Sequence, residues 1–180
     1  MSDKKIVFLC GNGDTLIRFR LELIKSLIKK SYEIYAYAPE IRDEFLEELT
    51  ELNVKFEKIP FQRKDLNPIN TLKSIVHITQ KLKSLNPDIL FSYTHKSVVV
   101  GSICAYLAKV KSSYSLITGT GHIFGRDTLK QRIQRIFGII GFKIALRLNK
   151  KVFFQNPDDL RFFIRLKIVS PEESILVNGS

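Results

Sequence analysis

The sequence predicts an α/β fold in which a mostly parallel sheet carries helices on both faces. Short apolar runs alternate along the chain with longer segments whose apolar residues recur at helical spacing. The first run, residues 5–10, is followed by a glycine turn and an amphipathic segment, which together form the first half of a βαβ unit. No repeat or low-complexity tract interrupts the alternation, so strands and helices are expected to alternate in a parallel sheet.

Each element follows from local pattern and from the residues that end it. The run at 5–10 is too short for a helix and reads as a buried strand, and the next segment places Leu16, Leu23 and Leu27 among charged residues, as an amphipathic helix does. Pro39 and Asn86 mark the end of a strand and of a helix. On these grounds we expect strands at 5–10, 33–39, 54–60, 89–93, 113–118, 151–155 and 175–177, and helices at 16–30, 40–52, 69–85, 98–109, 127–149 and 157–166.

Length and composition are those of one folded domain. The chain has 180 residues, 44% of them hydrophobic and 13 of them phenylalanine, which is enough for a core and makes disorder improbable. The net charge of +11 favours an anionic partner such as nucleic acid, an acidic membrane surface or a phosphorylated substrate. Cys10 and Cys104 lie far apart in apolar runs, so they are expected to be buried thiols in a reducing compartment. No apolar run is long enough for a signal peptide or a membrane span.

The glycine turn after the first run matches a dinucleotide-binding motif only in part. Gly11 and Gly13 fit its first two glycines, but Leu16 stands where the third is required. Asp14 is placed to cap the next helix, whose N-terminus favours an anionic group. A turn that only reverses the chain explains the two glycines as well as a ligand loop does.

Three loops are expected at the carboxyl ends of the strands, where ligands bind to parallel sheets. They cover residues 11–14, 94–96 and 119–125. His122 is the first candidate for a catalytic residue and His95 is a weaker one, although either histidine could have a purely structural role. The candidate substrate-binding residues are Gly11, Asn12, Gly13, Asp14, Arg18, Thr94, Lys96, Thr118, Gly119 and Gly121.

Several of these pieces, in this order and spacing, resemble family 4 glycosyltransferases of the GT-B type. The matching segments are residues 19–27, 35–39, 87–90 with 94–96, 117–121, 154–159 and 177–180. The resemblance is greatest to bacterial enzymes that extend undecaprenyl-diphosphate-linked sugars, of the diacetylbacillosamine N-acetylgalactosaminyl type. It implies that residues 1–180 form the Rossmann-like N-terminal half of a GT-B fold, which binds the acceptor.

The same resemblance implies a function and a missing partner. It implies retaining transfer of a sugar from a nucleotide-sugar, with a UDP-sugar expected, to a lipid-linked or polysaccharide acceptor in surface glycan synthesis. The donor would be held mainly by a C-terminal domain that these 180 residues lack, so the chain alone is expected to show no turnover. No metal and no other cofactor is expected in this domain. The expected location is the cytoplasm, peripheral to the inner face of the plasma membrane.

Residues 126–151 contain eight basic residues and one acidic residue around an apolar centre at 137–142. A basic helix with an apolar centre suits an anionic membrane surface. We expect contact through Arg132, Arg135, Phe142, Lys143 and Arg147. The alternative is a helix packed into the core with solvated ends.

Two other classes of function compete with this interpretation. One is the nucleotide-binding domain of a sugar-nucleotide epimerase or dehydrogenase, which Leu16 in place of the third glycine disfavours. The other is a basic nucleic-acid-binding module. It is disfavoured because the charge is concentrated on one helix and no known motif is present, so no nucleic-acid partner is expected.

Overall fold

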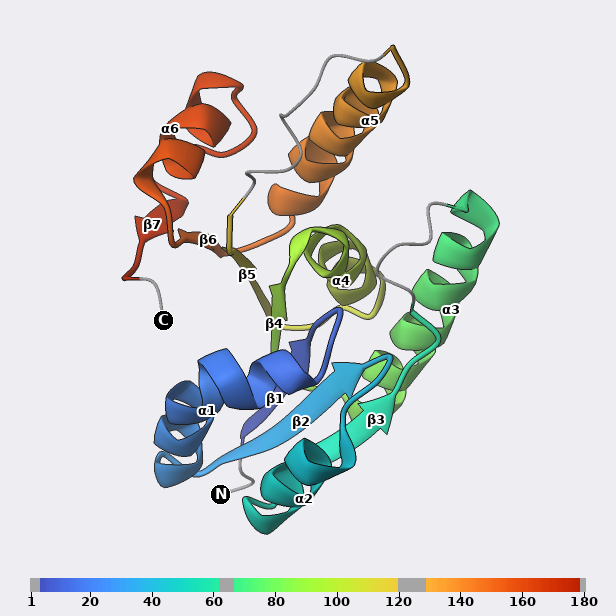
Figure 1. The fold of residues 1–180 in the computed structure, drawn as a ribbon, viewed down its shortest axis with the longest axis vertical. Coiled ribbons are helices and arrows are strands. Elements are labelled where there is room, and N and C mark those ends of the chain that lie inside the picture. Colours follow the sequence, from blue (N-terminus) through green and yellow to red (C-terminus); the bar gives the residue numbers. More distant parts are fainter. Residues whose placement is uncertain (1–3, 62–66, 120–128, 179–180) are drawn as a thin grey trace.

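The structure, a computed structural model, describes residues 4–61, 67–119 and 129–178, and within 129–137 it describes the side chain of Ile136 only. Seven parallel strands form one sheet in the order β3-β2-β1-β4-β5-β6-β7 (Figure 1). The strands are β1 (Lys4–Leu9), β2 (Tyr32–Ala38), β3 (Lys55–Lys58), β4 (Ile89–Tyr93), β5 (Ser112–Ile117), β6 (Lys151–Phe154) and β7 (Ser174–Leu176). The helices are α1 (Asp14–Lys29), α2 (Asp43–Glu51), α3 (Pro68–Leu85), α4 (His95–Leu107), α5 (Leu129–Leu146) and α6 (Pro157–Arg165).

The predicted fold class and the predicted order of elements are confirmed. Helices cover both faces of the sheet because crossovers between parallel strands are right-handed. The face on which a crossover helix packs therefore depends on the side toward which the chain moves to its next strand. The chain moves one way from β1 to β3, and α1 and α2 pack over the core that contains Phe8 and Ile34. It then returns past β1 to β4, so α3 to α6 pack over the other face, in the cores around Leu90 and Phe154.

The direction of travel reverses beside β1, which pairs with β2 on one side and with β4 on the other. Val7 is in register with Tyr35 of β2 and with Leu90 of β4. The loops after β1 and β4 therefore leave the sheet next to each other and lead to helices on opposite faces. This switch point is where open α/β sheets leave a crevice for ligands.

A buried polar network joins α4, β5 and the end of α5. The Asn149 side-chain amide accepts hydrogen bonds from the hydroxyls of Ser113 (3.0 Å) and Ser115 (2.9 Å) through Oδ1. Its Nδ2 donates to Ser102 Oγ (2.8 Å) and to the carbonyl of Ala145 (3.0 Å). Because both ends of the amide have partners, the network fixes α5 on the sheet without leaving a buried polar group unpaired.

Helix α5 has one buried face and one exposed face, which the uniformly apolar sequence at its centre does not indicate. Phe142 is only 5% exposed and packs edge-on against Phe163, 5.4 Å between ring centres. Phe142 is thus a core residue, and its predicted place among the membrane contacts is wrong. Ile136, Ile140 and Ile144 lie on the exposed face.

The two cysteines are buried and unpaired, as predicted. Burial raises the pKa of both thiols to about 11, so they stay protonated at neutral pH. Among the helices of the described ranges, none is both long enough and apolar enough to pass through a bilayer.

Candidate functional site

The candidate site lies at the carboxyl edge of the sheet, where the turn after β1 and the start of α4 meet at the switch point (Figure 1). The β1–α1 turn is packed tightly against the loop after β2. A methyl group placed on Gly13 would lie 2.7 Å from Ile41 Cβ and 2.8 Å from the carbonyl oxygen of Glu40. The Gly13 N–H donates to that carbonyl at 2.8 Å. Glycine is required here because another backbone segment approaches closely, which the sequence pattern of the turn does not reveal.

The first amides of α1 all have acceptors within the protein. The N–H of Asp14 donates to Asn12 Oδ1 at 2.8 Å, and the N–H groups of Thr15 and Leu16 donate to the carbonyls of Asn12 and Gly13. The prediction that Asp14 caps the helix is wrong, because Gly13 is the N-cap residue and Asn12 supplies the side-chain acceptor. An anion at this helix end would have to displace these bonds, so the geometry disfavours a phosphate at the N-terminus of α1.

The Asp14 carboxylate instead binds Arg42 from the loop before α2. Its oxygens accept from the Arg42 N–H at 3.0 Å and from Arg42 Nε at 2.7 Å. Burial raises the pKa of Asp14, but the hydrogen bonds and charge of Arg42 outweigh that effect and lower the pKa overall. The stability that this pair contributes is present above the pKa of an unfolded aspartate, about 3.9, and is lost as the pH falls through the lowered folded pKa.

A chain of hydroxyl groups connects β4 to the β1–α1 turn. Tyr93, the last residue of β4, places its hydroxyl 2.9 Å from Thr15 Oγ1. Thr15 Oγ1 donates to the Asn12 carbonyl at 2.6 Å, and the Cys10 thiol approaches the same carbonyl at 3.3 Å. The guanidinium of Arg20 lies 5.3 Å from the centre of the Tyr93 ring. Sequence reasoning missed Tyr93, although a polar-tipped side chain at the end of a buried strand is a usable signal.

The second loop of the site is shorter than predicted. Residues 94–96 were predicted to form a loop, but His95 and Lys96 already belong to the first turn of α4. Thr94 is therefore the one residue between β4 and α4. Its φ of +72° and ψ of 144° are a conformation that residues with side chains rarely adopt. Lys96 Nζ lies 5.2 Å from the centre of the Phe61 ring, and the His95 ring packs edge-on against Phe142.

The other candidate residues are placed less closely together. Thr118 is exposed and Gly119 has φ +122° just beyond β5, at the same edge of the sheet. The exposed Arg18 lies 5.6 Å from the Phe45 ring, over which Arg42 also stacks. Gly121 and His122 fall outside the described residues, as do the side chains of Arg132 and Arg135. In the described part of the chain, no three His, Cys, Asp or Glu side chains gather as a metal site would require.

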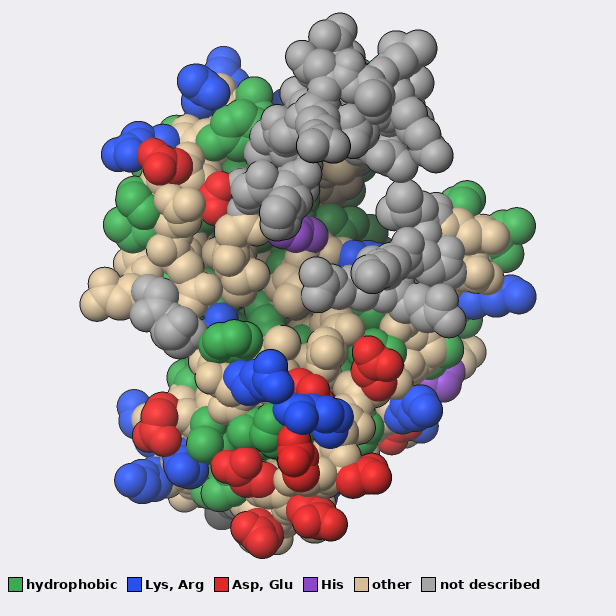
Figure 2. All heavy atoms as spheres, in the orientation of Figure 1, with side chains coloured by type: hydrophobic (Ala, Val, Ile, Leu, Met, Phe, Trp, Pro, Cys, Tyr) green, Lys and Arg blue, Asp and Glu red, His purple; other side chains and the backbone are tan. Residues whose placement is uncertain are grey.

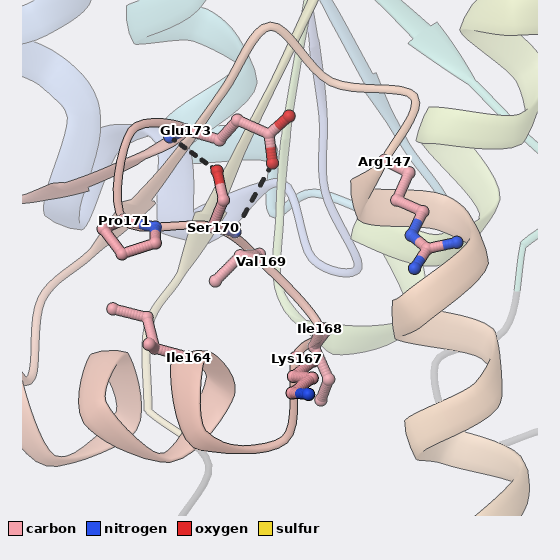
Figure 3. Close-up of a pocket in the computed structure, with 8 residues that line it drawn as sticks. All are labelled: Arg147, Ile164, Lys167, Ile168, Val169, Ser170, Pro171 and Glu173. Atoms are coloured by element: carbon pink, nitrogen blue, oxygen red, sulfur yellow. Dashed lines mark hydrogen bonds between the residues drawn. The ribbon is translucent and has the colours of Figure 1, made fainter.

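A pocket with a volume of about 540 Å³ lies elsewhere in the described part of the chain. It is formed by the end of α5, the end of α6 and the segment that leads into β7 (Figure 3). Segments that lead into parallel strands lie at their amino ends, so this pocket is at the opposite edge of the sheet from the switch point. Ser170 and Glu173 close its loop by exchanging hydrogen bonds, the Ser170 N–H donating to the Glu173 carboxylate and the Glu173 N–H to Ser170 Oγ.

Comparisons with known proteins agree with this architecture. Among solved structures, the chain superposes on the MurG protein of Acinetobacter baumannii with a TM-score of 0.62 at 15% identity, over 98% of this chain and 45% of that one. It superposes on the UDP-N-acetylglucosamine 2-epimerase of Rickettsia bellii with a TM-score of 0.65 at 15% identity, over 98% of this chain and 45% of that one. At such identities these likenesses concern the fold alone.

Sequence comparison is more specific. The chain is 28% identical over 162 residues to the N,N'-diacetylbacillosaminyl-diphospho-undecaprenol alpha-1,3-N-acetylgalactosaminyltransferase of Campylobacter jejuni. The match covers 90% of this chain and 43% of that protein, so the chain spans less than half the length of this relative. The model of the family described as glycosyl transferase 4-like matches residues 5–156, which include both loops of the switch point. The chain therefore belongs to the glycosyl transferase 4-like family.

Proposed function

We propose that this chain is the acceptor-binding domain of a retaining glycosyltransferase. The enzyme would move a sugar from a UDP-sugar to a lipid-linked diphosphate acceptor in the synthesis of a surface glycan. The observation that carries the proposal is the family match over residues 5–156, together with similarity over 90% of the chain to a transferase whose name specifies a diphospho-undecaprenol substrate.

The two loops of the switch point suit different parts of such an acceptor. Lys96 brings a positive charge to the first turn of α4, whose N-terminus favours anions, so this side is suited to the diphosphate. The β1–α1 turn carries the Asn12 amide and the Asp14 carboxylate, whose oxygens also accept from the Asp14 N–H and from Arg42. Amide and carboxylate groups suit sugar hydroxyls rather than phosphate. Thr118 and Gly119 at the end of β5 complete the edge.

Transfer of this kind depends on positioning and on stabilising the charge of the leaving diphosphate. We assign no protein nucleophile, and the acceptor hydroxyl attacks the face of the sugar from which UDP departs. The contacts to the donor would come mainly from a second domain, since the related transferase is more than twice as long as the region it shares with this chain. The 180 residues alone are therefore expected to be inactive.

The proposal is tested by incubating the product of the complete gene with UDP-sugars and an undecaprenyl-diphosphate-linked sugar. We expect UDP release and an acceptor extended by one sugar, both dependent on the lipid-linked acceptor, and neither from the purified 180-residue chain. Conversion of UDP-N-acetylglucosamine to an epimer without acceptor would instead assign the domain to a sugar-nucleotide epimerase. Robust transfer by the 180 residues would contradict the two-domain part of the proposal.

We further propose that the face formed by α3, α4 and α5 contacts the membrane that holds such an acceptor. None of these three helices contains Asp or Glu. In contrast, acidic side chains gather over α2 on the other layer (Figure 2). The described exposed apolar residues of α3 and α5 are Ile69, Leu72, Val76, Ile136, Ile140 and Ile144. Basic charge around exposed apolar side chains is the pattern of a helix that lies on an anionic lipid surface.

Charge removal from α5 is expected to weaken membrane binding. Each basic residue near an anionic surface contributes about 1 kcal/mol at most, so Arg132, Arg135, Lys143 and Arg147 changed together to Gln should weaken binding by up to about 4 kcal/mol and clearly lower the fraction that floats with anionic liposomes. The matched control changes Lys4 of β1, Lys25 and Lys29 of α1 and the C-cap residue Lys30 to Gln, and should float like the unchanged chain. Equal flotation of both variants would place the membrane contact on another surface.

A further inference from the structure

We infer that Tyr93 and Thr15 are positioning residues that lock the two loops of the switch point in one relative geometry. The inference rests on the proposed function, since the ligand whose binding they would prepare is the lipid-linked acceptor. Their hydroxyl groups link the end of β4 to the start of α1 across 78 residues of the sequence. The Cys10 thiol, in the β1–α1 turn, also hydrogen-bonds to the Tyr93 hydroxyl.

The Tyr93 hydroxyl has no obvious purpose in the core. The side chain is 2% exposed and lies in the same hydrophobic core as Phe8, Leu16 and Ala36, where a phenylalanine would fill almost the same space. A buried hydroxyl is costly unless it is hydrogen-bonded, and this one reaches Thr15 Oγ1 at 2.9 Å. Burial raises the pKa of Tyr93 well above its usual range, so the hydroxyl keeps its proton and remains a donor.

The link ends on main chain that belongs to no helix or strand. The Asn12 carbonyl is approached by Thr15 Oγ1 at 2.6 Å, by the Thr15 N–H at 3.3 Å and by the Cys10 thiol at 3.3 Å. Three donors directed at one carbonyl hold the peptide plane of the turn in one orientation. Because the Tyr93 hydroxyl holds Thr15 Oγ1 in place, this orientation depends on the position of the end of β4.

Tyr93 also adjoins the second loop of the switch point, at Thr94. Tyr93 directly precedes Thr94, whose φ of +72° is costly and persists only where the surroundings enforce it. The Arg20 guanidinium also lies over the Tyr93 ring, 5.3 Å from its centre. Because the Tyr93 hydroxyl contacts Thr15 and its backbone continues directly into Thr94, Tyr93 holds both loops in place before the acceptor binds. Such preorganisation raises affinity by removing the cost of ordering the loops on binding.

The test uses Tyr93→Phe and Thr15→Val, separately and together, with Tyr37→Phe as a matched control. Tyr37 is also almost fully buried at the carboxyl end of a strand, but it lies in the core on the opposite face of the sheet. Amide hydrogen exchange is measured on the 180-residue chain. Acceptor KM and kcat are measured on the product of the complete gene.

Loss of one hydrogen bond of this kind corresponds to about a two- to tenfold effect. We expect Tyr93→Phe and Thr15→Val each to speed exchange at residues 13–16 by such a factor and to raise acceptor KM similarly, with kcat nearly unchanged. The double variant should be no worse than the more affected single one, and Thr15→Ser should restore both values. Tyr37→Phe should change neither.

Exchange at residues 13–16 that is the same in Tyr93→Phe as in Tyr37→Phe would overturn the inference. Additive effects of Tyr93→Phe and Thr15→Val on exchange would overturn it as well, because they would show that the two hydroxyls act independently. If the unchanged complete protein transfers no sugar, the proposed function fails, and the exchange measurement still decides whether the two hydroxyls hold the turn.

Discussion

Replacement of Gly101 by valine is expected to destabilise the fold more than any other single change considered for this chain. Gly101 lies in α4 where the helix presses on β1 and β4. A methyl group placed there would lie 2.2 Å from Ser92 Oγ, 2.8 Å from Leu9 Cδ2 and 3.1 Å from Ser92 Cβ. The hydroxyl could rotate away, but Ser92 Cβ is fixed by its strand, so the helix or the sheet must shift. Inserting bulk into a packed core costs about 1–3 kcal/mol and occasionally more, and valine adds two further methyl groups to the first.

We therefore expect Gly101→Ala to lower the free energy of unfolding by about 2 kcal/mol and Gly101→Val by about 4 kcal/mol, a large part of what a domain of this size has. Urea denaturation of the 180-residue chain measures both. Gly138→Ala in α5 is the matched control, because a methyl group there meets nothing within 4 Å. Helix propensity predicts that this control gains up to about 1 kcal/mol. A Gly101→Val protein as stable as the unchanged chain would show that α4 does not pack this closely on the sheet.

Replacement of His122 by alanine in the product of the complete gene is expected to lower kcat by roughly ten- to a thousandfold, the range for a lost polar contact in the transition state. The expectation comes from the sequence, because His122 lies outside the described residues. In the sequence it comes shortly after β5 and Gly119, and these two lie at the carboxyl edge where the two described loops meet. A histidine there could bond to the acceptor or to the transferred sugar.

Steady-state kinetics with the melting temperature measured alongside decide this prediction. His77→Ala in α3, on a helix away from the switch point, is the control and should leave kcat unchanged. If His122→Ala keeps both kcat and KM, then His122 has only a structural role. His95 would be a poor replacement candidate, because its ring packs against Phe142 in the structure.

The sequence predicts the layout of this fold well because alternation and periodicity are local signals. Strands of apolar residues and helices with one apolar face could be read from neighbours in the chain, and their order then determines a parallel sheet with two helical layers. Ends of elements were harder to place. Helix α4 begins at His95 rather than at 98, because Thr94 takes up the turn with a positive φ that no propensity assigns to threonine.

The site could be predicted only as a set of loops. Gly13 looked like a ligand-binding glycine, yet its close neighbour is the loop after β2, a contact made across 28 residues. Asp14 looked like a helix cap, yet Arg42 reaches it from that same loop. Phe142 lies in a stretch that is apolar all round, so no period indicates that it faces the core. The residues that contact Gly13, Asp14 and Phe142 are distant from them in the sequence. A single sequence does not show which distant residues are in contact.

The central claim is that this domain holds a lipid-linked diphosphate acceptor at the carboxyl edge of the sheet, between the β1–α1 turn and the start of α4. Chemical-shift mapping tests it most directly, by titrating the isotope-labelled 180-residue chain with a short-chain polyprenyl diphosphate that carries one sugar. We expect shifts at residues 11–15, 94–97 and 118–119. Shifts confined to the pocket of Arg147, Lys167 and Ser170, at the opposite edge, would contradict it.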